Sequence, residues 1–172
     1  MRRSNRNLAV LAVFAALGFS ACAKNDVQVT TLAIGPAGAT SIADFEVRQA
    51  QTYAISLEYP YKEGDQVGRA QVWKLAGGSV QEYPGKWVEP GASLRVQVRI
   101  VQKQDGAELP VVDRIVRKPR LSAWGSGTLS AELVAVPLSV GNYRVTVTSL
   151  DEAPSFIGAQ TRVRVGRAYR GK

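Results

Sequence analysis

Carboxylates are the first residues of this chain whose type could support catalysis. A glycosidase-like enzyme would need two of them at a set spacing across a cleft. Most of the acids that lie close to aromatic residues stand in turn-like sequence, where carboxylates are usually solvated or cap helices. We therefore expect no catalytic pair, and a carboxylate-based hydrolase is the alternative. The acids in question are Glu58, Glu63, Asp65, Glu82 and Glu89.

Composition excludes most other catalytic chemistry. The 172 residues include no histidine and one cysteine. The chain therefore lacks the usual general base, the Ser-His-Asp and Cys-His nucleophile systems, and the commonest ligand of transition metals. No Gly-x-Ser-x-Gly, Walker or dinucleotide-binding motif occurs, and the acids are too scattered for a calcium loop. We expect a protein that is not an enzyme and holds no metal or cofactor.

A cluster of cations is the first candidate for a binding site. Arg114, Arg117, Lys118 and Arg120 place four positive charges within seven residues. Such a cluster can contact phosphate headgroups or an acidic protein partner. The alternative is an edge strand whose charges prevent pairing with other chains.

Aromatic residues in loop-like sequence are the second candidate. Trp87 follows Pro84-Gly85-Lys86, and Trp124 precedes Gly125. Aromatic residues and arginine are the types most often found at binding hot spots. For the tryptophans, Trp73 included, core burial with a hydrogen-bonded indole is the alternative. The expected partner-binding surface consists of Tyr61, Tyr83, Trp87, Trp124, Arg117, Lys118 and Arg120.

The elements that would carry these residues follow an export signal. Arg2, Arg3 and Arg6 form a basic start, and an uninterrupted apolar stretch of twelve residues runs from Leu8 to Phe19. This stretch is shorter than the roughly 20 residues that a helix needs to cross a bilayer. Residues 1–21 are therefore interpreted as a signal peptide.

The only cysteine, Cys22, directly follows the small residues Ser20 and Ala21. This arrangement resembles the lipobox of bacterial lipoproteins, although Phe19 stands where that family usually has leucine. The resemblance implies lipidation of Cys22 and therefore a membrane partner through a lipid anchor. The alternative is an ordinary secretory signal that leaves Cys22 as a free thiol.

The expected cellular location and the net charge of the mature chain both follow from the lipoprotein interpretation. Ala23 and Lys24 come after the cysteine instead of aspartate, and by the lipobox resemblance this favours the outer membrane, facing the periplasm. Residues 22–30 are expected to form the acylated tether. Without residues 1–21 the chain has 19 basic and 14 acidic residues, a net charge of +5. In the cell envelope this charge points to anionic lipid or an ordinary surface, not to nucleic acid.

Two-residue alternation of apolar and polar side chains dominates the rest of the chain. Turn-forming pairs such as Gly77-Gly78, Pro90-Gly91 and Asp105-Gly106 separate the alternating segments. Seven or eight short strands of this kind predict an all-β fold, an immunoglobulin-like two-sheet antiparallel sandwich over residues 31–166. A basic tail at 167–172 would follow it. The clearest alternating segments are 45–48, 53–59, 94–100, 144–148 and 162–165.

Two local features refine this prediction. Asp65 can cap a helix over about 66–76 that ends at Gly77, and a strand over 70–75 is the alternative. Gly141 precedes Tyr143 by two residues at a strand start. This spacing resembles the tyrosine corner of immunoglobulin-like sandwiches, in which the phenol bonds a backbone group upstream.

Three blocks of sequence together resemble the proteobacterial lipoprotein family called domain of unknown function 5625. The resemblance covers about residues 45–165, and it implies an envelope lipoprotein with an all-β domain. It brings no catalytic residue with it. The blocks are 53–66 with 72–77, 89–91 with the strand from Leu94, and 141–145 with 149–154.

We therefore expect a membrane-anchored periplasmic lipoprotein that acts as a non-catalytic interaction module for a protein partner. One alternative is an immunity lipoprotein that neutralises a secreted antibacterial toxin. The other is a carboxylate-based hydrolase of the envelope. A neighbouring toxin gene would favour the first alternative, and a cleft with two close carboxylates would favour the second.

Overall fold

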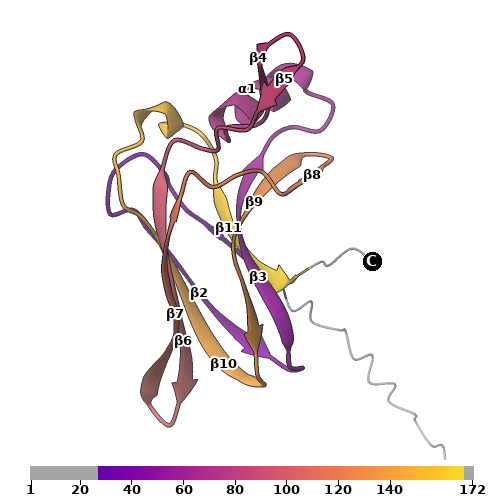
Figure 1. Ribbon diagram of the computed structural model, residues 1–172. Coiled ribbons are helices and arrows are strands. Elements are labelled where there is room, and N and C mark those ends of the chain that lie inside the picture. Colours follow the sequence, from indigo (N-terminus) through magenta and orange to yellow (C-terminus); the bar gives the residue numbers. More distant parts are fainter. Residues whose placement is uncertain (1–26, 169–172) are drawn as a thin grey trace, which may run out of the picture.

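The computed structural model describes residues 27–168; the expected signal peptide, Cys22 and most of the expected tether lie outside this range. Two antiparallel sheets pack face to face, and one helix and a small hairpin stand at one end (Figure 1). The sandwich expected from the alternation is confirmed. The strands of the first half are β1 (Gln28–Thr31), β2 (Thr40–Val47), β3 (Gln51–Pro60), β4 (Val80–Tyr83) and β5 (Lys86–Val88). Those of the second half are β6 (Arg95–Gln104), β7 (Ala107–Arg117), β8 (Ala123–Gly125), β9 (Thr128–Leu138), β10 (Gly141–Ser149) and β11 (Arg162–Arg167).

One sheet has the strand order β1-β11-β3-β9-β8, and the other has the order β2-β10-β6-β7. β1 begins at Gln28, inside the segment expected to be a tether, because it pairs with β11 from Gln28 opposite Val165. β11 ends at Arg167, the first residue of the expected tail. A short 3-10 helix, η1 (Pro154–Phe156), connects β10 to β11.

The core consists of the inward-facing positions of the alternating segments. Val96, Val98 and Ile100 of β6 are fully buried, whereas Arg99 between them is exposed. Removal of such apolar side chains from water is the main force that holds two sheets together. η1 adds Phe156, which is buried against Tyr59 at a ring distance of 6.4 Å.

Two long strands did not show the simple alternation, because each contains an extra residue. The register of β7 against β6 shifts between Ile100 and Val101, which leaves Val111 without an opposite partner. The register of β9 against β3 shifts in the same way at Leu133. An extra residue moves all later side chains to the other phase of the two-residue period. β7 and β9 therefore belong to the sandwich although their sequences do not alternate continuously.

The tyrosine corner predicted at Tyr143 is present. Tyr143 is buried, and its hydroxyl donates a hydrogen bond of 3.0 Å to the carbonyl of Ser139, four residues upstream. Its ring stacks on Phe45 of the neighbouring strand β2, with 5.6 Å between the ring centres. Burial raises the pKa of Tyr143 above its ordinary value. The residue joins β10 to the connection before it.

The helix interpretation of the segment after β3 is correct. α1 spans Gln66–Leu75, and the Asp65 side chain accepts a hydrogen bond of 2.9 Å from the amide of Gly68. At the other end the amides of Gly77 and Gly78 bond the carbonyls of Lys74 and Trp73, the pattern of a Schellman motif. Gly77 has φ +66°, which glycine adopts without the penalty of a Cβ atom.

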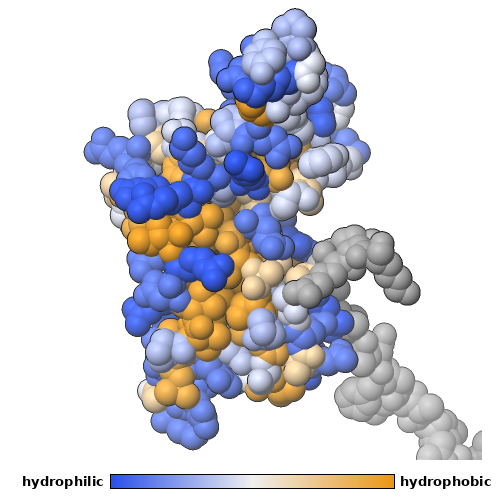
Figure 2. Space-filling view, in the orientation of Figure 1, coloured by the Kyte–Doolittle hydropathy of each residue, from blue (hydrophilic) through white to orange (hydrophobic). Residues whose placement is uncertain are grey.

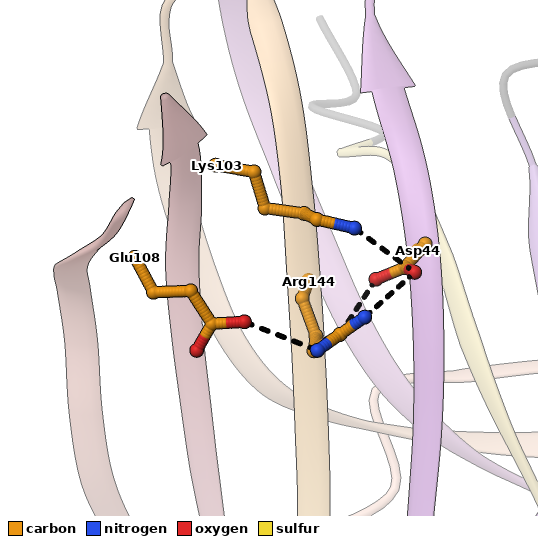
Figure 3. Close-up of polar contacts among 4 residues, drawn as sticks. All are labelled: Asp44, Lys103, Glu108 and Arg144. Carbon is orange, nitrogen blue, oxygen red and sulfur yellow. Dashed lines mark hydrogen bonds and ion pairs between the residues drawn. The ribbon is translucent and has the colours of Figure 1, made fainter. Parts of the chain in front are cut away.

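Ion pairs connect the four strands of the second sheet across its outer face. Arg144 of β10 lies between Asp44 of β2 and Glu108 of β7, and Lys103 of β6 also reaches Asp44 (Figure 3). Hydrogen bonds from Arg144 are the main reason that the pKa of Asp44 lies below its ordinary value. Because all four side chains are paired among themselves, this network is structural.

Candidate interaction surface

The connections at one end of the sandwich meet and hold one another in place. We call this the helix end: α1, the β4–β5 hairpin, β8 and the connections around them (Figure 1). The amide of Gly91 bonds the carbonyl of Gly77 at 3.0 Å, and the amide of Ala92 bonds that of Pro119 at 2.9 Å. Three connections that are distant in sequence are therefore joined by backbone hydrogen bonds.

Two glycines permit this close approach. A Cβ atom on Gly77 would lie 1.9 Å from the carbonyl carbon of Gly91, and one on Gly91 would lie 2.3 Å from the carbonyl oxygen of Lys118. Real Cβ atoms do not approach a backbone so closely, so no other residue fits without displacing it. The helix end is thus a fixed support for its side chains.

Trp124 on β8 is 63% exposed, and it rests on a second indole. Its ring meets Trp73 of α1 edge to face, with 6.2 Å between centres. Trp73 is half-buried, its indole NH donates to the carbonyl of Ser79 at 3.1 Å, and the guanidinium of Arg69 lies 5.6 Å from its ring centre. Trp73 thus has the hydrogen-bonded indole of the core alternative but is only half-buried, whereas Trp124 lies at the surface.

Tyr61 supports the turn next to Trp124. Tyr61, one of the predicted partner contacts, is half-buried, and its hydroxyl donates a hydrogen bond of 2.8 Å to the carbonyl of Gly125. The amide of Tyr61 also bonds the carbonyl of Gly127 at 2.9 Å. These two bonds hold the β8–β9 turn, so Tyr61 positions the neighbouring Trp124.

The β4–β5 hairpin carries the other two aromatic candidates. Tyr83 is 56% exposed and Trp87 is 65% exposed, on a hairpin whose residues face solvent almost throughout. The ammonium of Lys86 lies 5.0 Å from the centre of the Tyr83 ring and forms an ion pair with Glu82. Tyr83, Trp87 and Trp124 are thus large aromatic side chains presented to solvent at the same end of the molecule.

The predicted cations are exposed, on β7 and on the connection that follows it. Arg114 and Arg117 belong to β7, which is an edge strand. An edge strand was one of the two interpretations of this cluster. Lys118 and Arg120 lie on the connection from β7 to β8. Within residues 27–168, none of the four forms an ion pair within 4 Å.

A hollow that the residue pattern did not predict lies between the start of α1 and the β8–β9 turn. Tyr61, Glu63 and Arg69 line it, together with Ser126 and Gly127. The residue types that line the hollow were visible in the sequence, but their closeness to Ser126 and Gly127 depends on the fold.

Most of the acids considered for catalysis lie on separate elements, but Glu63 and Asp65 share the connection before α1 and both line the hollow there. Glu58 of β3 pairs with Arg162 and Arg164, at 3.2 and 3.7 Å. Asp65 caps α1, and Glu82 lies on the hairpin. Across the described part of the chain, no group of three or more metal-binding side chains is found. Within the same range, no helix is long and apolar enough to cross a bilayer.

The architecture is thus that of a small all-β sandwich with an aromatic, helix-bearing end. The chain belongs to the family described as domain of unknown function (DUF5625), whose model matches residues 31–167. No curated protein matches it. In a comparison with solved structures, a protein from Sulfurospirillum deleyianum matches with a TM-score of 0.66 and 15% identity, over 84% of this chain and 98% of that one. This likeness shows the shared fold.

Weaker matches reach larger or unrelated proteins. A family GH115 4-O-methyl-alpha-glucuronidase matches with a TM-score of 0.37 and 12% identity, over 95% of this chain and 20% of that one. A family 35 carbohydrate-binding module from an environmental isolate matches with a TM-score of 0.33 and 13% identity, over 80% of this chain and 76% of that one.

Proposed function

We propose that this chain is a lipid-anchored protein of the periplasm that binds a protein partner through its helix end and does no catalysis of its own. The observation that carries the proposal is the exposure of Trp87 and Trp124, at 65% and 63%, at one end of the molecule. Trp124 is held there by its ring contact with Trp73 and by the hydrogen bond from Tyr61 to Gly125. Buried aromatic side chains supply much of the energy of protein interfaces. Indoles that are fixed before binding lose little conformational entropy when a partner covers them.

The position of Val27, the first described residue, supports an anchor at Cys22. Val27 lies beside Gly166, which pairs with Ala54 in the first half of β3, whereas α1 follows the far end of β3 after Pro60. Ala54 and Pro60 are six residues apart on β3, about 20 Å at the usual rise per residue. Because only a few residues connect Cys22 to Val27, an acylated chain would hold the first half of β3 near the bilayer. The helix end would then point away from the membrane, toward soluble or wall-bound partners.

Double replacement of Trp87 and Trp124 by alanine tests the binding surface. We expect affinity capture of a partner from cross-linked envelopes to be lost, because both indoles leave the interface. The circular dichroism spectrum should stay unchanged, and the cost to stability should be only about 1 kcal/mol from the lost contact with Trp73.

A matched control is Ile42→Ala with Val140→Ala, since these side chains are 56% and 63% exposed but belong to other parts of the surface. The control should capture the same partner as the unchanged protein. Unchanged capture by the tryptophan variant would contradict the proposed surface. Loss of the folded state would return both indoles to a structural role.

The anchor is tested separately by Cys22→Ala. The unchanged protein should enter the detergent phase and carry acyl mass on its cysteine, because stable anchoring takes more than one lipid chain. The variant should remain unprocessed or stay in the aqueous phase. A wild-type protein with an unmodified thiol in the aqueous phase would contradict the lipoprotein interpretation.

A further inference from the structure

We propose that the outer edge of β7 accepts an extended, acidic segment of a protein partner by strand addition. This inference rests on the proposed function in one respect, namely that the chain binds a protein. It concerns a second surface, along the side of the sandwich, and assigns both a binding mode and a partner chemistry to it.

The edge is open along its whole length. β7 pairs only with β6, and it is the last strand of its sheet among the residues that the structure describes. On the facing sheet, β8 pairs with β9 only from Thr128 to Ser130. The rest of that side of β9 has no ladder partner between residues 27 and 168. An exposed strand edge offers a row of backbone donors and acceptors to an incoming strand.

Apolar side chains border this edge on its inner side. Val112 pairs with the buried Ile100, and Val116 pairs with the buried Val96, so both face inward. They are nevertheless only partly buried, as is Val136 of β9. Figure 2 shows the resulting hydrophobic strip between β7 and β9, on the side where the sandwich is open. An added strand could place alternate apolar side chains on this strip.

Charge selects the kind of strand that fits. Arg114 pairs with Val98 and therefore points to the inner side, yet it is exposed and makes no ion pair or hydrogen bond within the described chain. Arg117, Lys118 and Arg120 continue the positive charge toward the helix end. From residue 111 to residue 121 there are four cations and one acid, Asp113. An acidic segment would neutralise cations that form no ion pair within 4 Å among residues 27–168.

The same charges argue against a second copy of this chain. Two β7 edges would bring like charges together, and such repulsion is a common protection against edge-to-edge pairing. Pro110 also removes one backbone donor near the start of the strand. Residues 111–117 contain no proline, and this length matches that of an ordinary strand, about five to six residues or more.

The test measures fluorescence anisotropy of labelled peptides with the full chain in detergent. The first probe is a proline-free peptide of about ten residues, long enough for one strand. Every second residue is valine or glutamate in turn, with threonine between them, because Val112, Arg114 and Val116 share one face of β7. The second replaces every glutamate by lysine. The third is the acidic peptide with N-methyl groups on alternate amides, which removes strand donors but keeps the charges. We expect the acidic peptide to bind, and the other two to bind at least about tenfold more weakly.

Variants of the protein locate the site. Arg114→Glu with Arg117→Glu should weaken the acidic peptide at least about tenfold and favour the lysine peptide, because the charge of the edge is reversed. Lys62→Glu with Lys74→Glu changes the net charge equally on exposed residues away from β7 and should leave affinity nearly unchanged. Melting curves confirm that both variants are folded.

Each other outcome overturns the proposal. Equal binding of the N-methylated peptide would mean attraction by charge without strand pairing. Equal binding of the lysine peptide, or no binding of any peptide, would exclude an acidic strand. The Trp87 and Trp124 variant should bind the acidic peptide normally, so failure here is distinguishable from failure of the proposed helix-end surface.

Discussion

Two buried tyrosines differ in whether their hydroxyl groups have a hydrogen-bond partner. The hydroxyl of Tyr143 bonds the Ser139 carbonyl, so burial leaves no polar atom without a partner. The hydroxyl of Tyr59 is also buried, but it has no hydrogen-bond partner within the described residues. Burial raises the pKa of Tyr59 above its ordinary value, because a phenolate would be poorly solvated there. The ring of Tyr59 packs in the core beside Phe156.

The first prediction follows from this contrast. Tyr143→Phe should lower the free energy of unfolding by about 1–3 kcal/mol, because the Ser139 carbonyl loses its donor. Tyr59→Phe should leave stability unchanged or raise it, because it removes a buried hydroxyl that has no partner and keeps the ring. Urea unfolding of the two variants beside the unchanged protein measures both effects. Equal losses in the two variants would contradict the prediction.

Local chemistry at the ends of α1 explains why this element could be predicted and others could not. Asp65 and Gly77 are strong cap signals, and each forms the bond expected of it. The tyrosine corner was recognisable for the same reason, since Tyr143 and Ser139 are neighbours in sequence. Strands β7 and β9 gave no clean period, because Val111 and Leu133 interrupt the alternation.

The arrangement of the candidate site could not be predicted from the sequence, because it depends on contacts between distant segments. The pairing of Trp124 with Trp73, and of the Tyr61 hydroxyl with Gly125, depends on three separate elements meeting. Exposure of Trp87 and Trp124 likewise depends on where the hairpin and β8 lie relative to the sandwich. Residue types indicated the candidates, but only the fold separated Tyr61, a supporting residue, from the exposed indoles.

The second prediction concerns α1 as an element. Asp65→Ala should destabilise the helix by about 0.5–2 kcal/mol, because the amide of Gly68 loses its capping partner. No residue of α1 is fully buried, so the helix can open without the sandwich. Hydrogen exchange should therefore accelerate in the α1 amides and stay unchanged in β3 and β6. Uniform acceleration throughout the domain would mean that α1 and the sandwich unfold as one unit.

On the scale of the whole molecule, the two proposed surfaces and the proposed anchor occupy different regions. The helix end carries the exposed aromatic residues, and the β7 edge carries the exposed Arg114 and Arg117. The described chain enters beside β11, at the opposite edge of the five-stranded sheet from β8. A chain held at Cys22 would therefore leave both surfaces free, which suits a protein that connects a membrane to a partner in the periplasm.

The third prediction tests this orientation with the protein's own fluorescence. The chain has three tryptophans, and Trp73, Trp87 and Trp124 all belong to the helix end, so their emission reports on that end alone. In the acylated protein bound to vesicles, brominated lipids should quench this emission little, because the proposed orientation points the helix end away from the bilayer. Soluble iodide should quench most of it, since two of the three indoles are largely exposed. Trp87→Phe with Trp124→Phe serves as the control and should lose most of the iodide effect, because the half-buried Trp73 remains. Strong quenching by brominated lipids, with a blue shift on binding to vesicles, would show that the aromatic end inserts into the membrane and would reverse the proposed orientation.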